Sequence, residues 1–295
     1  MKHARVIDGK VVASRIKLEA AELVRALLVE GVRVSLDVVM VGDPASGEIY
    51  TRSQRLNCQE VGIEHRLHAL PPGTSENDIR NLIRRLNQDS KVTGILLNLP
   101  LPAGIDTPAI QYCIDPYKDV EGVNPANLGL LFYDQAIIAP CTALAVMEMV
   151  KEAGIEVRGL NAVVVGQGAI GGRPVSLFLL HESATVTSCH IATRDLHQHT
   201  RQADLLIVAA GCPALIGREH VKTGAVVIDV GINSVLDSSG ERRVVGDVVF
   251  EEVREVASVI TPVPGGVGPV TTAILIRSAA QAAHNQHHQP RRIDA

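Results

Sequence analysis

The sequence is poor in aromatic residues, which make up 2% of its 295 positions and include no tryptophan. Its core must therefore be built from aliphatic side chains and alanine, a composition that suits parallel sheets covered by helices. Apolar residues account for 46% and charged residues for 20%, the balance of a folded globular protein rather than of a disordered chain.

Other absences exclude several classes of partner. With a net charge of −4 and no basic stripe interleaved with aromatic residues, the chain is not expected to bind nucleic acid. No apolar run reaches the length of a membrane span, and the N-terminus has no apolar signal core, so no membrane partner is expected. The five cysteines lack the spacing of metal ligands. We interpret them as reduced and mostly buried, which predicts a cytoplasmic location and no metal site.

What is present is an alternation of helix and strand signals. Apolar residues at helical spacing from Val12 to Leu27 predict a helix that ends at Gly31. Later signals predict strands at residues 34–41, near 63 and at 94–99, with helices at about 46–61 and 79–86. After residue 140 the pattern restarts, with predicted strands at 161–165, 184–187, 205–210 and 226–230. This alternation predicts parallel sheets with right-handed crossovers.

We therefore expect two three-layer α/β domains, of which the second is a Rossmann-like dinucleotide-binding domain. The predicted boundaries are 1–139 for the first domain and 140–268 for the second. A helix at 269–285 is expected to pack back onto the first domain, and residues 286–295 are expected to form a flexible tail. His284, His287 and His288 could bind a metal weakly, but a solvated end is the favoured interpretation.

A glycine motif marks the second domain. Gly166, Gly168 and Gly171 follow a predicted strand and precede a predicted helix, a context that favours binding of a dinucleotide pyrophosphate at the helix N-terminus. A tight turn without a ligand is the alternative. The next predicted strand ends at His190-Ile191-Ala192 and lacks the acidic residue that would bind a ribose hydroxyl, so the cofactor's identity stays open.

Two further segments allow a functional or a plain structural interpretation. Tyr50 and Gln54 share one face of a predicted helix, with Asn57 one turn further along, and such a polar face is more often solvated surface than a site. The stretch Thr261–Pro269 is dense in proline and glycine. It could hold a flat ligand against the backbone, or it could serve as a rigid connector.

Six segments in the same order carry a resemblance to a known family. They are Pro44-Ala-Ser-Gly-Glu-Ile-Tyr50, Gly94-Ile-Leu-Leu-Asn-Leu-Pro-Leu-Pro102, Lys118-Asp-Val-Glu-Gly122, Asp229-Val-Gly-Ile-Asn233, Gly246-Asp-Val-Val-Phe250 and Thr261–Pro269. Over nearly its whole length the chain resembles the methylenetetrahydrofolate dehydrogenase/cyclohydrolase proteins. The resemblance implies a homodimer whose two domains enclose a cleft for a tetrahydrofolate substrate beside NADP. In the family, hydride passes from the methylene carbon to the nicotinamide, and water then opens the methenyl product.

The resemblance also assigns site residues. The implied catalytic residues are Tyr50, Gln54, Asn98 and Glu121. The implied substrate-binding residues are Tyr50, Asn98, Leu99, Pro100, Glu121, Pro264, Gly265 and Gly266. The implied cofactor-binding residues are Gly166, Gln167, Gly168, Gly171, Arg173, Ile191 and Ile232.

The substrate side departs from the family at three positions. Gln54 stands where the family has a catalytic lysine, and an amide cannot act as a general acid or base. We therefore predict that hydrolysis of methenyl-tetrahydrofolate is impaired or lost. Asn98 is one methylene shorter than the family's glutamine, and Glu121 is one methylene longer than its aspartate. Neutral drift fits the last two changes, whereas three changes within one pocket also fit coordinated repurposing.

The cofactor side departs as well. Gln167, Ile191 and Ala192 replace the cationic and hydroxyl side chains that would meet a 2′-phosphate, so the preference for NADP should fall. Arg173 and Arg194 lie nearby in the sequence and could compensate. The segment that begins at Pro140 also lacks the family's second proline and its glycine, which affects the connection between the domains.

Three functions remain possible on the sequence alone. The first is a methylenetetrahydrofolate dehydrogenase that uses NAD or NADP, because hydride transfer needs orientation more than an acid or base. The second is a non-redox enzyme that transfers the methylene carbon to a small amine acceptor. The third is a regulator that binds folate or nucleotide without turnover. We rank them in that order, with a narrow gap between the first two.

Overall fold

The computed structural model describes residues 3–42, 44–236 and 240–288, without the side chains of residues 44–50. Contacts between Cα atoms divide the chain into two compact units. The N-terminal unit comprises Arg15–Cys141 and Thr272–Ala295, and the C-terminal unit comprises Met1–Ser14 and Thr142–Thr271. The predicted architecture of two α/β units is confirmed.

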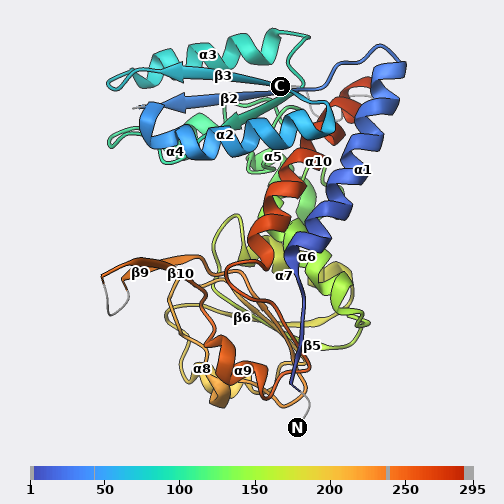
Figure 1. Cartoon of the computed structure of the whole chain (residues 1–295), viewed down its shortest axis with the longest axis vertical. Helices are drawn as coiled ribbons and strands as arrows, with labels where there is room; N and C mark the ends of the chain where they lie inside the picture. The colour runs from blue at the N-terminus through green and yellow to red at the C-terminus, as the bar shows by residue number, and fades with distance from the viewer. Residues whose placement is uncertain (1–2, 43, 237–239, 289–295) are drawn as a thin grey trace. The chain divides into compact units, whose positions relative to one another are not determined.

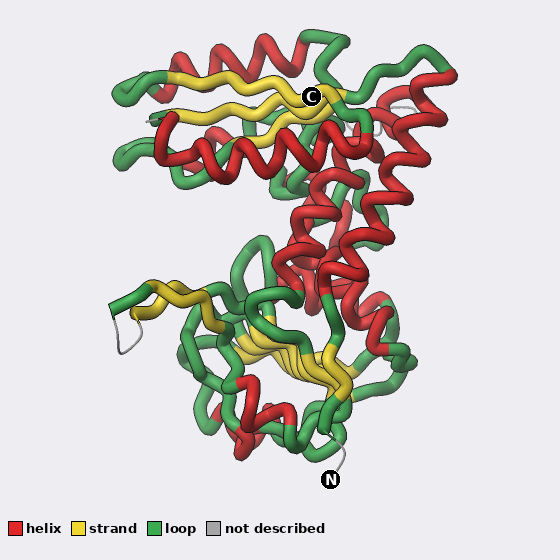
Figure 2. Tube along the Cα trace, viewed as in Figure 1, coloured by secondary structure: helices red, strands yellow, loops and turns green. Residues whose placement is uncertain are grey.

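A three-stranded parallel sheet forms the centre of the N-terminal unit (Figures 1 and 2). Its strand order is β3-β2-β4, with β2 at Ser35–Val41, β3 at Glu64–Leu70 and β4 at Gly94–Leu97. The helices of this unit are α1 (Gly9–Val29), α2 (Pro44–Val61), α3 (Glu76–Gln88), α4 (Thr107–Gln111), α5 (Pro125–Phe132) and α10 (Val267–His288). Of these, α1 and α10 begin in the C-terminal unit.

Both faces of this sheet are covered, since all seven residues of β2 are buried. Figure 1 shows α2 and α3 on opposite sides of β2 and β3. The apolar face of α3 packs on one side, where Ile79 and Ile83 belong to the same cluster as Val39 and Leu97. Ser75 begins α3 as its N-cap, because its hydroxyl accepts a hydrogen bond from the Asp78 N–H. The helical spacing of the apolar residues and the N-cap together place α3 where the sequence predicts a helix.

The C-terminal unit is built on a six-stranded parallel sheet with the order β1-β11-β8-β7-β5-β6. These strands are β1 (Arg5–Val6), β5 (Asn161–Val165), β6 (Thr185–Cys189), β7 (Leu205–Val208), β8 (Val226–Asp229) and β11 (Val259–Ile260). An antiparallel pair, β9 (Asn233–Leu236) and β10 (Arg242–Val245), projects from it. The helical elements are α6 (Cys141–Ala153), α7 (Gly172–His181), α8 (Leu196–Thr200), the 3₁₀ helix η1 (Arg218–His220) and α9 (Phe250–Arg254).

The order of this sheet creates a switch point. From β5 the chain crosses to β6 on one side and then to β7 on the other. In open parallel sheets, ligands bind outside the carboxyl ends of strands where the winding reverses. The segments that follow β5 and β7, which begin at Gly166 and Ala209, meet at this position. The fold thus offers a ligand position directly beside the glycine motif.

The two ends of the chain do not follow the domain boundaries predicted from the sequence. Residues up to Ser14 belong to the C-terminal unit rather than to the first domain, because β1 hydrogen-bonds along β11 as an edge strand. Residues 286–288 do not form the expected flexible tail, since α10 is helical through His288 and the Gln286 side chain is hydrogen-bonded. Residues 289–295 lie outside the described part. Within the described residues, no helix has the length and apolar character needed to cross a bilayer.

Candidate functional site

Two polar residues of the N-terminal unit lie at the carboxyl edge of its sheet. Asn98 directly follows β4, and its N–H donates to the Val39 carbonyl at 2.8 Å. A parallel bridge pairs Ile95 with Asp119, so the segment leading to Glu121 runs beside β4 in the same direction. Predicted residues Asn98 and Glu121 therefore reach the same edge, where α/β sheets bind their ligands. Leu99 and Pro100 come next, and both are exposed.

Asp119 organises the turn that presents Glu121. Its buried carboxylate accepts hydrogen bonds from the N–H groups of Gly122 at 3.1 Å and Asn124 at 2.7 Å, and from Asn127 Nδ2 at 3.2 Å. Three donors on one carboxylate fix the backbone on both sides of Glu121. The sequence marks Lys118–Gly122 as a family motif, but its pattern does not single out Asp119 as a functional residue.

The neighbouring Lys118 is also structural. Its ammonium group donates to three backbone carbonyls at the end of α3, those of Leu86, Asn87 and Asp89, at 2.7–3.0 Å. A cation that caps a helix C-terminus in this way complements the helix dipole and the last unpaired carbonyls. The Lys118 side chain is buried. Because its ammonium group is engaged by these carbonyls, it does not replace the lysine that the family has at position 54.

Burial raises the pKa of the Glu121 carboxyl to about 7, with a further contribution from the negative charge of Asp119. Burial likewise raises the pKa of Asp229 to about 6. When the pH lies between the pKa of such a group in the unfolded state and its raised pKa in the folded state, the folded state binds more protons than the unfolded state. These two residues therefore lower the stability of the protein as pH rises from about 4 through 7.

We expect the Glu121→Gln variant to lose less stability than the wild type when the pH rises from 5 to 8, because it lacks one of these titrating groups. Thermal unfolding midpoints across that range measure the effect. Glu64→Gln is the matched control: hydrogen bonding to Arg66 lowers the pKa of Glu64, so its contribution falls below this range. Parallel pH profiles for Glu121→Gln and the wild type would contradict the assignment.

Gln54 is buried, with 2% of its surface exposed, and lies on the inner stripe of α2 with Thr51 and Cys58. The interpretation of this polar face as solvated surface is therefore wrong for Gln54. Within the described residues, neither its Oε1 nor its Nε2 atom has a hydrogen-bond partner. A buried amide left unpaired costs roughly 1–3 kcal/mol per group, so Gln54 is expected to pair with a group other than the described residues, such as a bound ligand or an undescribed side chain. The Tyr50 side chain lies outside the described residues.

The glycines of the motif in the C-terminal unit, and Gly172 next to it, differ in how closely other atoms surround them. Gly166 has a φ of +93°, and an added Cβ would overlap the Ala209 carbonyl; at Gly172 an added Cβ would overlap the Gly166 carbonyl. These two glycines are needed for packing between strand, loop and helix. Apart from adjoining residues, no atom of the described chain lies within 4 Å of the Cβ positions of Gly168 and Gly171. This open backbone at the start of α7 fits a dinucleotide pyrophosphate.

Of the three predicted cofactor-binding residues with side chains beside this loop, only one offers a charged group to a phosphate. Gln167 turns back, and its Nε2 donates to the Val164 carbonyl at 3.1 Å. Ile191 is fully exposed after β6, and Arg173 is exposed in the first turn of α7. Arg173 thus supplies a nearby cation, while Ile191 offers only apolar surface.

Asp229 and Asp247 form a buried scaffold behind the switch point. The Asp229 carboxylate accepts from the N–H groups of Gly231, Asp247 and Val248 at 2.9–3.1 Å. The Asp247 carboxylate accepts from Asn233 Nδ2 at 2.8 Å. It also accepts from the N–H groups of Ala210 and Gly211 at 2.7 and 2.9 Å. This network, which sequence reasoning missed, fixes the loops after β7 and β8.

The segment after β8 and the proline-rich loop Thr261–Pro269 enclose a pocket of about 230 Å³. Asp229 and Lys10 contribute to its wall. The lining includes four of the predicted site residues: Ile232, Pro264, Gly265 and Gly266. The structure thus brings a predicted cofactor residue and three predicted substrate residues together, although they are far apart in the sequence. This grouping favours a ligand loop over a plain connector.

Comparisons with known proteins agree with these features. The model of the tetrahydrofolate dehydrogenase/cyclohydrolase catalytic domain matches residues 7–121, and that of its NAD(P)-binding domain matches residues 140–287. The bifunctional protein FolD of Moorella thermoacetica is 46% identical over 280 residues, which cover 95% of this chain and 99% of that protein.

Solved structures of similar proteins cover the chain almost completely. The bifunctional FolD methylenetetrahydrofolate dehydrogenase/cyclohydrolase from Campylobacter jejuni is 42% identical, with a TM-score of 0.90 over 96% of this chain and 99% of that one. The Trypanosoma brucei FolD enzyme, solved with NADP and an inhibitor, is 38% identical. Its TM-score is 0.91 over 98% of this chain and 100% of that one.

Proposed function

The chain belongs to the tetrahydrofolate dehydrogenase/cyclohydrolase family, and we propose that it oxidises methylene-tetrahydrofolate to methenyl-tetrahydrofolate with little hydrolysis of the product. Gln54 carries this proposal. It occupies the lysine position of the family motif, it is buried, and its amide has no partner among the described residues. An amide can hold a folate by hydrogen bonds, but it cannot exchange a proton with water near neutral pH.

The other residues of the N-terminal unit bind and orient the substrate. Glu121 and Asn98 offer a carboxylate and an amide at one edge of the sheet, a set that can recognise the donors and acceptors of a pterin ring. Asp119 holds the Glu121 turn in place through its hydrogen bonds to the backbone. Orientation of this kind is what hydride transfer requires of a protein.

The C-terminal unit binds the dinucleotide. Gly168 and Gly171 allow the pyrophosphate to approach the backbone at the N-terminus of α7, and Arg173 lies beside it. Bound NAD or NADP supplies the hydride acceptor. The reaction needs no acid or base from the chain, so replacing the lysine by Gln54 removes the second activity and leaves the first.

A direct assay tests the proposal. Methylene-tetrahydrofolate mixed with the protein and NADP, or separately with NAD, should increase the absorbance of reduced nicotinamide. No increase with either dinucleotide, combined with tight binding of tetrahydrofolate, would refute the dehydrogenase activity. It would support the second candidate, non-redox transfer of the methylene carbon to a small amine, which Gln54 favours because no group in its place activates competing water. Absence of both turnover and transfer would leave a folate-binding regulator.

The preference for NADP should be weak and should respond to one added cation. Ala192→Arg is expected to raise the affinity for NADP relative to NAD by about 10–100-fold, because a charge-assisted hydrogen bond to phosphate contributes about 1.5–3 kcal/mol. Titration with each dinucleotide measures the ratio. Leu180→Arg, which adds the same charge at the exposed far end of α7, is the control and should leave it unchanged.

We further propose a homodimer in the cytoplasm. The family resemblance supports the dimer, and light scattering during gel filtration tests it: a single-chain mass would rule it out. All five cysteines are free, and Cys58, Cys141 and Cys189 are buried. Unpaired buried thiols suit a reducing compartment.

A further inference from the structure

A group of metal-ligating side chains lies at the end of α10, in the N-terminal unit. Glu30 directly follows α1, and His287 and His288 form the last turn of α10. Glu30 Oε2 lies 3.3 Å from His287 Nε2 and 2.9 Å from His288 Nε2. One ligand atom from each residue lies within 4.8 Å of the others. Folding therefore brings Glu30 next to two adjacent histidines that lie far from it in the sequence.

We infer that Glu30, His287 and His288 form a binding site for one divalent metal ion of the zinc class. Tetrahedral zinc bonds of about 2.0–2.1 Å place neighbouring ligand atoms roughly 3.3 Å apart, and the two distances at Glu30 are close to this value. Two imidazoles and one carboxylate suit zinc, nickel or cobalt. Magnesium and calcium prefer sites made of oxygen atoms alone.

The histidine-bearing turn is held in place by its neighbours. Gln286 Nε2 donates to the carbonyls of Thr93 and Tyr117 at 2.7 and 3.0 Å. Asn285 Nδ2 donates to the Ile137 carbonyl at 3.1 Å. These bonds fix the last turn of α10 on the body of the unit. His287 and His288 are thus presented from a rigid backbone, which a metal site requires.

The Glu30 side of the site is equally fixed. After α1 the chain turns at Gly31, which has a φ of +84°. The N–H of Gly31 donates to the Leu28 carbonyl at 3.0 Å, and that of Val32 donates to the Leu27 carbonyl at 2.9 Å. This is the hydrogen-bonded end that commonly closes a helix. The carboxylate therefore extends from a defined turn toward the two imidazoles.

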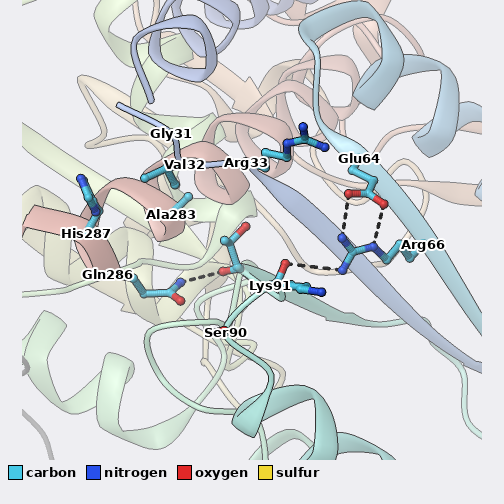
Figure 3. Close-up of a pocket in the computed structure, with 11 residues that line it drawn as sticks. Gly31, Val32, Arg33, Glu64, Arg66, Ser90, Lys91, Ala283, Gln286 and His287 are labelled. Carbon is cyan, nitrogen blue, oxygen red and sulfur yellow. Dashed lines mark hydrogen bonds and ion pairs between the residues drawn. The ribbon is translucent and has the colours of Figure 1, made fainter. Parts of the chain in front are cut away.

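The site is open to solvent. All three ligands are exposed, and His287 also lines a pocket of about 600 Å³ beside α10 (Figure 3). Figure 3 shows His287 and Gln286 on α10 near the turn at Gly31 and Val32. Three protein ligands leave a fourth position for water. The centroid of the His284 ring lies 4.6 Å from that of the His288 ring.

Zinc titration of the full chain tests the site. Calorimetry should give one ion per wild-type chain, and His287→Gln, His288→Gln and Glu30→Gln should each weaken binding at least tenfold. Saturating zinc should raise the unfolding temperature of the wild type, because an ion that binds only the folded state stabilises it, and should not raise that of the His287→Gln/His288→Gln variant. His199→Gln, at an exposed histidine in α8, is the matched control and should bind zinc as the wild type does.

Several outcomes would overturn the inference. They are no zinc binding by the wild type, unchanged affinity in the histidine variants, or magnesium binding as tight as zinc binding. Unchanged affinity in Glu30→Gln, with loss in the histidine variants, would also overturn it, since the site then would not join α1 to α10. None of these measurements depends on the folate reaction.

Discussion

The Gln54→Lys variant is expected to hydrolyse methenyl-tetrahydrofolate about 10²–10⁴ times faster than the wild type, the range that general acid–base assistance usually contributes. The new amine would replace a buried amide that has no partner among the described residues, so no existing hydrogen bond between described residues is lost. Burial also lowers the pKa of a lysine, which favours proton exchange near neutral pH. Loss of methenyl-tetrahydrofolate absorbance over time measures the rate.

The matched control is Gln54→Met, which keeps the length of the side chain without an exchangeable proton. It should bind folate more weakly and gain no hydrolysis. If Gln54→Lys gains nothing while it still binds folate, the shorter Asn98 and the longer Glu121 have also reshaped the pocket. The triple variant with Asn98→Gln and Glu121→Asp should then recover the activity. Failure of that variant as well would contradict the role assigned to position 54.

Asp247→Ala is expected to destabilise the C-terminal unit by about 3–5 kcal/mol. It leaves three partly buried donors without their acceptor: the N–H groups of Ala210 and Gly211, and Asn233 Nδ2. Each unsatisfied group costs roughly 1–3 kcal/mol. The unfolding temperature should fall by roughly 10 °C, and dinucleotide binding should weaken, since these loops border the switch point.

Asp247→Asn serves as the control. It retains one oxygen acceptor and nearly the same volume, so we expect a smaller fall in unfolding temperature and partial retention of dinucleotide binding. A fall of less than about 2 °C in Asp247→Ala would show that the network does not stabilise the unit.

The elements of the fold were largely predictable because local signals and burial agree. The helix α3 combines a cap at Ser75 with apolar residues on one face, and β2 is rich in β-branched and other apolar residues and is buried throughout. The glycine motif was predictable for the same reason: Gly166 must adopt a positive φ and pack against Ala209, and only glycine does both.

The remaining features depend on tertiary contacts that no local pattern reports. The burial of Gln54 arises from the packing of α2, while its sequence neighbours Arg55 and Leu56 are exposed. The strand β1 has only two residues and is recognisable only beside β11. Asp119 and Asp247 stand in motifs associated with ligand binding, yet they hold backbone turns. Likewise, His287 and Glu30 become neighbours only when α1 and α10 pack together.

The measurement that tests the central claim most directly follows both products in one reaction. Methylene-tetrahydrofolate, NADP and the protein are mixed, and reduced nicotinamide and methenyl-tetrahydrofolate are recorded together over time. We predict that both rise in step and that methenyl-tetrahydrofolate then persists, decaying no faster than without protein. Rapid conversion to formyl-tetrahydrofolate at the rate of nicotinamide reduction would contradict the assignment of Gln54 as a residue that binds folate without activating water.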